Sequence, residues 1–198
     1  MNRAGLSVAC AAWALLATLP LPVAADTALN ARAQARPDGR IEIHNRGLGS
    51  INVQGWARPE VEITGHLGRG SERLDLTSEG GFVRIEVVLT PGDKVRILDT
   101  ASKLVVQVPS GSDLSIRSGW DVKVRGVTGP QSVRSLNGRV TLSADAGISR
   151  LVDISTGLGD VRLDLIGTPD AQFELTTTSG EFQNCFGPRG PHHDGREG

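Results

Sequence analysis

Short runs of alternating apolar and polar residues recur along this chain, and each pair of runs is joined by a turn containing glycine. In the clearest example, Ile154 to Leu165, a first run leads through Gly157 and Gly159 into a second run, Val161 to Leu165. Alternation with a period of two is typical of a β-strand with one buried face. No window outside the first residues has a helical period, so we predict an all-β protein.

The strand-turn-strand unit repeats about every 21 residues, which is within the range of known repeat architectures. We place the start of successive copies at Leu76, Ile97, Ile116, Val133, Ile154 and Leu175. Two residues after each start lies a short polar side chain: Ser78, Asp99, Ser118, Ser135, Thr156 and Thr177. Such side chains hydrogen bond to nearby backbone in turns, so we interpret this turn ladder as structural.

Apolar residues follow the turn in every copy. The first apolar position holds Val83, Leu104, Val122, Val140, Val161 and Phe182. The second holds Ile85, Val106, Val124, Leu142 and Leu163, and Asn184 interrupts the series. A unit this short cannot bury its apolar face alone, whereas stacked copies can. We therefore predict a single-domain β-solenoid or β-roll, with these residues in aligned interior rows.

The ends of the chain differ from the repeats. Residues 1–25 combine Arg3, an uncharged Ala/Leu-rich run, a Pro20-Leu21-Pro22 break and small residues, which is typical of a secretory signal peptide. The run is short for a membrane span, so we expect no stable span after cleavage, and lipidation at Cys10 is a minor alternative. We predict a flexible lead-in over 26–38, the β domain over 39–186 and a disordered Gly/Pro/His tail over 187–198.

The composition and charge of the chain exclude one class of function. The chain has 198 residues with 25 glycines, 4% aromatic residues and a formal net charge of -1. A nucleic-acid binder needs a basic face and usually stacking aromatics, so that class is excluded. After cleavage of the signal peptide, Cys185 would be the one remaining cysteine. A single cysteine in an exported protein points to an intermolecular disulfide, a buried thiol or a partner cysteine lost from this chain.

Three segments carry a resemblance to a known family. Residues 39–45, 49–56 and 61–65, with the Ser/Thr-Gly turn at Ser179-Gly180, resemble the opening and turns of the bacterial putative-adhesin family of exported β-strand-repeat proteins, long classed as a domain of unknown function. The resemblance covers about residues 39–186. It implies a β-helical protein of the cell envelope and carries over no catalytic residue. Similar proteins often continue into another Ser-Gly strand pair where this chain has its tail.

Few residues suggest chemistry. We predict no cofactor and no metal site, since only His192-His193-Asp194 in the tail has weak metal-binding character. The enzymatic alternative is a β-helical lyase or glycosidase in which Asp160 and Glu181, one repeat apart, form a carboxylate pair. Trp56 and Trp120 adjoin glycines at turns, and either they cap the stack or they contact a glycan or protein ligand.

These observations favour a non-enzymatic interaction or adhesion module that is exported to the periplasm or the cell surface. Its partner would be an envelope protein or a glycan, bound through a face of the stacked scaffold. An envelope-stress accessory protein is a further alternative. Homo-oligomers could form through the open end of the solenoid or through Cys185.

Overall fold

A computed structural model describes residues 28–68, 71–89, 101–144, 151–166 and 172–186, and its regular structure is entirely β. The all-β prediction is confirmed. The strands in these residues are β1 (Ala28–Gln34), β2 (Arg40–Asn45), β3 (Gly49–Trp56), β4 (Glu60–His66), β5 (Ser71–Glu79), β6 (Phe82–Leu89), β7 (Ser102–Pro109), β8 (Asp113–Ser118), β9 (Val122–Arg125), β10 (Gln131–Ser135), β11 (Val140–Ala144), β12 (Val152–Leu158), β13 (Val161–Leu165), β14 (Phe173–Ser179) and β15 (Phe182–Phe186).

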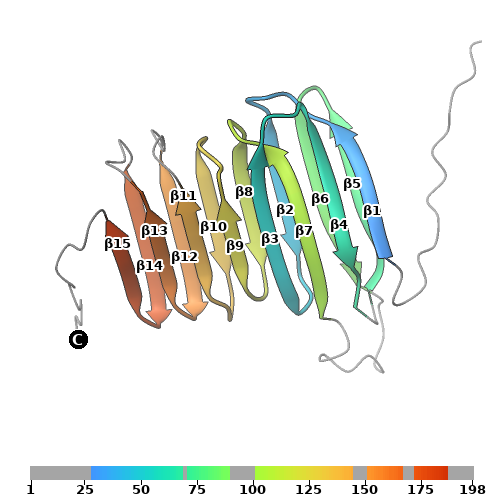
Figure 1. Cartoon of the computed structure of the whole chain (residues 1–198). Helices are drawn as coiled ribbons and strands as arrows, with labels where there is room; N and C mark the ends of the chain where they lie inside the picture. The colour runs from blue at the N-terminus through green and yellow to red at the C-terminus, as the bar shows by residue number, and fades with distance from the viewer. Residues whose placement is uncertain (1–27, 69–70, 90–100, 145–150, 167–171, 187–198) are drawn as a thin grey trace, which may run out of the picture.

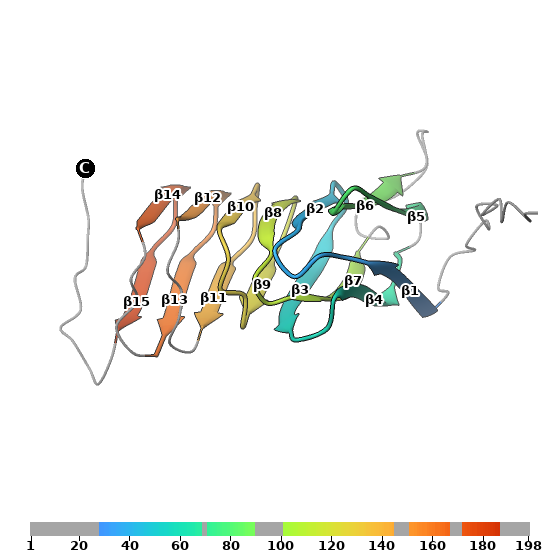
Figure 2. The ribbon, with the colours of Figure 1, turned by 90° about the horizontal axis from the view of Figure 1, so that it is seen from above.

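The strands form two mostly parallel sheets, consistent with a β-solenoid-like fold (Figure 1). Sheet A has eight strands in the order β1-β4-β7-β3-β9-β11-β13-β15. Sheet B has seven in the order β14-β12-β10-β8-β2-β6-β5. Seen from above, the two sheets lie in two layers along the length of the molecule (Figure 2). From β8 onward the chain alternates between sheets B and A, so each pair of strands makes one coil.

The core lies between the sheets and consists of aligned aliphatic rows. In sheet A one row follows the register of paired strands and contains Leu104, Ile51, Val122, Val140, Val161 and Phe182. In sheet B a second row contains Ile85, Ile43, Ile116, Val133, Ile154 and Leu175. Nearly all of these side chains are fully buried. Because the parallel strands are aligned, the apolar residues at one position of successive coils lie side by side, and each row packs without a gap.

The order of the coils in space differs from their order in the chain. β2 lies between β6 and β8 in sheet B, and β3 lies between β7 and β9 in sheet A. The coil of β6 and β7 is therefore on the far side of the coil of β2 and β3. β1, β4 and β5 pair antiparallel with their neighbours and complete this end of the stack.

This arrangement corrects the predicted first copy. Leu76 lies opposite Ile85 and so belongs to the sheet B row, but β5 runs antiparallel to β6. Two residues further on, Ser78 therefore lies opposite Val83, on the side of the row away from Ser118. Val83 itself pairs with Ile41 in sheet B instead of joining the sheet A row. Ile97 and Asp99, the next copy, lie outside the described residues.

The predicted flexible lead-in is also wrong over the part that the structure describes. Residues 28–34 form β1, which pairs with β4 along its whole length. Leu29 and Ala31 pack against the core, and their alternation with polar residues is that of a strand. The alternation was easy to miss because alanine contributes a weak apolar signal. The predicted signal peptide over 1–25 and the tail over 187–198 lie outside the described residues.

Candidate functional site

The turn ladder lies at the carboxyl ends of the sheet B strands. Ser118, Ser135, Thr156 and Thr177 occupy one register position, and Asn45 extends the row at its other end. Three of the hydroxyls donate across to the carbonyl of the turn in the preceding coil: Ser135 to Trp120 at 2.8 Å, Thr156 to Gly138 at 3.1 Å and Thr177 to Gly159 at 3.1 Å. The row is almost wholly internal, and these bonds satisfy turn carbonyls, so it stabilises the coils and offers no reactive group.

The other two members of this row bond within their own turns. The Ser118 hydroxyl accepts from the Trp120 amide at 3.1 Å, and the Asn45 side-chain oxygen accepts from the Gly47 amide at 3.1 Å. The sequence pattern does not reveal Asn45 as a member of this row, because a carboxamide replaces the hydroxyl there. Ser78 is separate from the ladder: its hydroxyl donates to the Gln34 carbonyl at 2.7 Å.

The outer face of sheet A carries polar side chains in register. Alternation turns them away from the core, and one row contains Asn52, Lys123, Thr141, Arg162 and Gln183. Adjacent strands lie about 4.8 Å apart, so such a row presents functional groups at that spacing along the stack.

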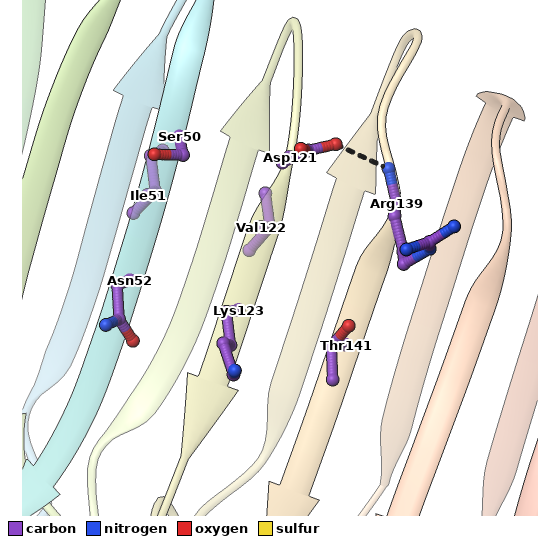
Figure 3. A pocket seen from close by; sticks show the side chains of 8 residues that line it. All are labelled: Ser50, Ile51, Asn52, Asp121, Val122, Lys123, Arg139 and Thr141. Carbon is purple, nitrogen blue, oxygen red and sulfur yellow. Dashed lines mark hydrogen bonds between the residues drawn. The ribbon is translucent and has the colours of Figure 1, made fainter.

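A shallow groove of about 320 Å³ crosses this face over β3, β9 and β11. Figure 3 shows Ser50 and Asn52 on β3, Lys123 on β9 and Thr141 on β11 along the groove. At its upper edge an oxygen of Asp121 accepts a hydrogen bond from the Arg139 backbone amide at 2.9 Å. The groove therefore combines amide, hydroxyl, ammonium and carboxylate groups over the strands of three neighbouring coils.

One polar atom in the groove has no partner. The side-chain oxygen of Asn52 is buried and accepts no hydrogen bond from the described residues. A buried acceptor without a donor costs about 1–3 kcal/mol.

A second hollow of about 310 Å³ continues from the groove onto the turns and shares Asp121 and Arg139 with it. Trp120 and Asn137 also line this hollow. The Trp120 side chain is 38% exposed, which is unusual for so large an apolar residue. Trp120 lines the second hollow and not the groove itself, and its predicted contact with a ligand stays a prediction.

Trp56, the other predicted contact, is held by its own turn. Its indole nitrogen donates to the Glu60 carbonyl at 2.8 Å, and the Arg58 guanidinium lies 5.0 Å from the ring centroid. These interactions join the end of β3 to the start of β4. They fit the capping interpretation of Trp56, and the structure does not bring Trp56 together with Trp120 in either hollow.

Asp160 and Glu181, the residues of the enzymatic alternative, lie in adjacent coils. One Asp160 oxygen accepts from the Arg139 guanidinium at 3.0 Å, and the other accepts from the Glu181 backbone amide at 3.3 Å. These bonds, the first above all, hold the pKa of Asp160 below its ordinary value. A glycosidase needs one carboxyl group with a raised pKa to act as the acid. Asp160 is shifted in the opposite direction.

The described residues contain no group of three His, Cys, Asp or Glu side chains arranged to hold a metal ion. The predicted weak metal-binding residues His192-His193-Asp194 lie outside the described part. Cys185 lies on β15 opposite Asp164, and the predictions for its thiol stay untested. Within the described ranges, no helix has the length and hydropathy needed to span a membrane.

Comparison with known proteins supports the fold. No family model and no curated protein sequence matches the chain. Among solved structures, a putative cell adhesion protein from Clostridium sporogenes ATCC 15579 is similar over 82% of this chain and 100% of its own, with a TM-score of 0.58 and 10% identity. A putative adhesin from Bacteroides fragilis NCTC 9343 matches over 80% of this chain and 97% of its own, at 11% identity and a TM-score of 0.29.

A third structure, a putative adhesin from Parabacteroides distasonis ATCC 8503, matches over 81% of this chain and 98% of its own, at 11% identity and a TM-score of 0.26. The predicted resemblance has its structural counterpart in the Clostridium protein. At these identities the likeness concerns the fold alone, and it rests on the Clostridium protein.

Proposed function

We propose that this protein is an exported interaction or adhesion module of the cell envelope, which binds an extended partner along the outer face of sheet A. The observation that carries the proposal is the groove over β3, β9 and β11, which runs into the exposed Trp120. The name of the Clostridium protein, a putative cell adhesion protein, supports the same direction.

The chemistry of the groove favours a glycan over an envelope protein as the partner. A sugar presents hydroxyls that both donate and accept, and the groove offers Asn52, Lys123 and Thr141 within a short distance of Asp121. Trp120 supplies an apolar surface beside them. The rigid stack fixes these groups before binding, which lowers the entropy lost on association.

The affinity of one such shallow groove should be modest. Repetition along the partner, or several copies of the protein at the cell surface, would raise the overall binding by multivalency. The proposed activity is therefore adhesion without turnover, in which binding leaves the partner chemically unchanged.

The test is binding of the full chain to an immobilised panel of bacterial envelope polysaccharides. We expect Thr141→Arg, which fills the groove, to abolish binding of the polysaccharide that the unmodified chain retains. Thr178→Arg is the matched control, because Thr178 is exposed on β14 in sheet B and lines neither the groove nor the hollow beside it. Equal binding by both variants, or release of shortened sugar chains, would contradict the proposal.

A further inference from the structure

The outer face of sheet B has a different charge pattern from the groove on sheet A. One row in this face contains His44, Arg117 and Arg134 on the adjacent strands β2, β8 and β10. The neighbouring row contains Ser115 and Ser132 on β8 and β10. A shallow hollow of about 290 Å³ lies over both rows.

The two central arginines are direct neighbours. Arg117 and Arg134 occupy opposite positions on parallel strands, so their Cα atoms are about one strand spacing, 4.8 Å, apart. Like charges at opposite positions destabilise a sheet. Nothing in the core needs this pair, because both side chains are exposed on the outer face. The cost is explained if an anion lies between the two guanidinium groups.

Neighbouring acids neutralise this row incompletely. Asp153 lies 3.7 Å from Arg134 and also accepts from the Ser132 hydroxyl at 3.4 Å. Glu42 is engaged by Arg40 at 3.0 Å. Among the residues that the structure describes, Arg117 makes no ion pair. The hollow is lined by three arginines, Arg40 being the third, and by a single acid, Asp113.

We propose that Arg117 and Arg134 bind the carboxylate or sulfate groups of an acidic polysaccharide, with the hydroxyls of Ser115 and Ser132 bonding to the same strand of sugar. Guanidinium groups bind such oxyanions through paired charge-assisted hydrogen bonds. A flat row across parallel strands suits an extended polymer. This second binding surface lies on the other sheet, so it does not depend on the groove that carries the proposed function.

An acidic polysaccharide fits this face better than a membrane surface does. Peripheral binding to a bilayer combines basic residues with apolar side chains that enter the lipid. In the described residues the large exposed apolar side chains are Trp120, Leu136, Leu151, Leu158, Ile166 and Phe182, and none lines this hollow. The groups beside the arginines are serine hydroxyls, which bond to sugars and anions but do not insert.

The experiment measures binding of the full chain to polygalacturonate and to heparin, with neutral dextran and vesicles of equimolar phosphatidylcholine and phosphatidylglycerol as the other arms. We expect binding to one or both acidic polymers, weakened by salt, and no binding to dextran through this face. Arg117→Gln and Arg134→Gln should each reduce the affinity about tenfold, as expected for one lost charge-assisted hydrogen bond.

Arg125→Gln is the matched control, since it removes the same charge from an exposed position on sheet A. It should change the affinity less than twofold, about 0.4 kcal/mol. An equal loss of affinity in all three variants would show that only the net charge of the protein matters, which would overturn the proposed site. Binding to the vesicles but not to the acidic polymers would overturn the choice of ligand. Thr141→Arg should leave this binding intact, which separates failure here from failure of the sheet A groove.

Discussion

From β8 to β15 every strand pairs in parallel with strands of adjacent coils, whereas β1, β4 and β5 at the other end pair antiparallel. In the parallel region one local pattern is repeated, so each internal coil pairs with an equivalent coil on each side. At the antiparallel end the chain reverses, and β1 and β5 become the edge strands of the two sheets. The stack therefore ends in the antiparallel strands β1 and β5 on one side and in the parallel strands β15 and β14 on the other.

The difference affects how well the core is covered. In the sheet A row, Val161 on β13 is fully buried, whereas Phe182 on β15 at the end of the same row is 40% exposed. At the other end of sheet A, β4 and β1 follow β7, and Leu104 on β7 is buried. Antiparallel strands thus complete a row that a further parallel coil would otherwise have to cover.

The largest expected effect tests how closely the parallel coils stack. A Cβ atom added to Gly138 would lie 2.3 Å from the Trp120 carbonyl carbon and 2.4 Å from the Asp121 amide nitrogen in the turn of the preceding coil. Since both are backbone atoms, Gly138→Ala must push two coils apart, and we expect a loss of about 3 kcal/mol in the free energy of unfolding. Urea denaturation measures it.

Gly80 in the turn between the antiparallel strands β5 and β6 is the matched control. A Cβ atom there would meet nothing within 4 Å, although its φ of +60° disfavours alanine. Gly80→Ala should cost about 1 kcal/mol, from backbone strain alone. Equal losses in the two variants would contradict the view that the close approach of neighbouring turns at Gly138 adds to the cost of backbone strain.

The same contrast explains which features the sequence could reveal. The rows through Ile116, Val133 and Ile154 were predictable because each coil repeats an apolar position and a turn at nearly constant spacing. The direction of β5 was not, since an antiparallel strand has the same alternation as a parallel one. The insertion of β2 beside β8 depends on contacts distant in the chain, which no local pattern records.

The candidate surfaces were predictable only in part. Trp120 was visible because an aromatic residue at a turn stands out in a chain with few of them. The neighbours of Asn52 and the pairing of Arg117 with Arg134 were not, because they follow from which strands are adjacent and how they are aligned. A row of charges on one face of a sheet becomes apparent only when the register is known.

A smaller effect tests the hydroxyls at two places. Thr156→Val keeps the shape of the side chain but removes the donor to the buried Gly138 carbonyl, so it should cost about 1–2 kcal/mol. Ser78→Ala removes a bond to the Gln34 carbonyl from an exposed hydroxyl on β5, and should cost under about 0.5 kcal/mol because water replaces it. Thermal or urea unfolding compares the two, and an equal cost would show that the ladder has no special role.

The smallest effects concern pH, where two groups on parallel coils, His44 on β2 and Asp160 between β12 and β13, should respond in separate ranges. Burial, followed by the positive charges of Arg84 and Arg117, lowers the pKa of His44 from its ordinary 6.5, although Glu42 and Glu86 oppose this shift. The unfolded chain therefore binds this proton more tightly, so stability is retained above about pH 6.5 and falls as the pH drops below it.

Asp160 in the parallel region responds only in acid. Its pKa is lowered from the ordinary 3.8, first by the hydrogen bond from Arg139, so its contribution is present above pH 3.8 and is lost as the pH falls through the folded-state pKa. His44→Gln should thus flatten the stability curve between neutral and mildly acidic pH. Asp160→Asn should lower the stability by a constant amount over that range, leave its slope unchanged and flatten only the acid limb. Urea unfolding over a pH series measures both. If the His44→Gln variant still loses stability at mildly acidic pH, another group must be responsible for that loss.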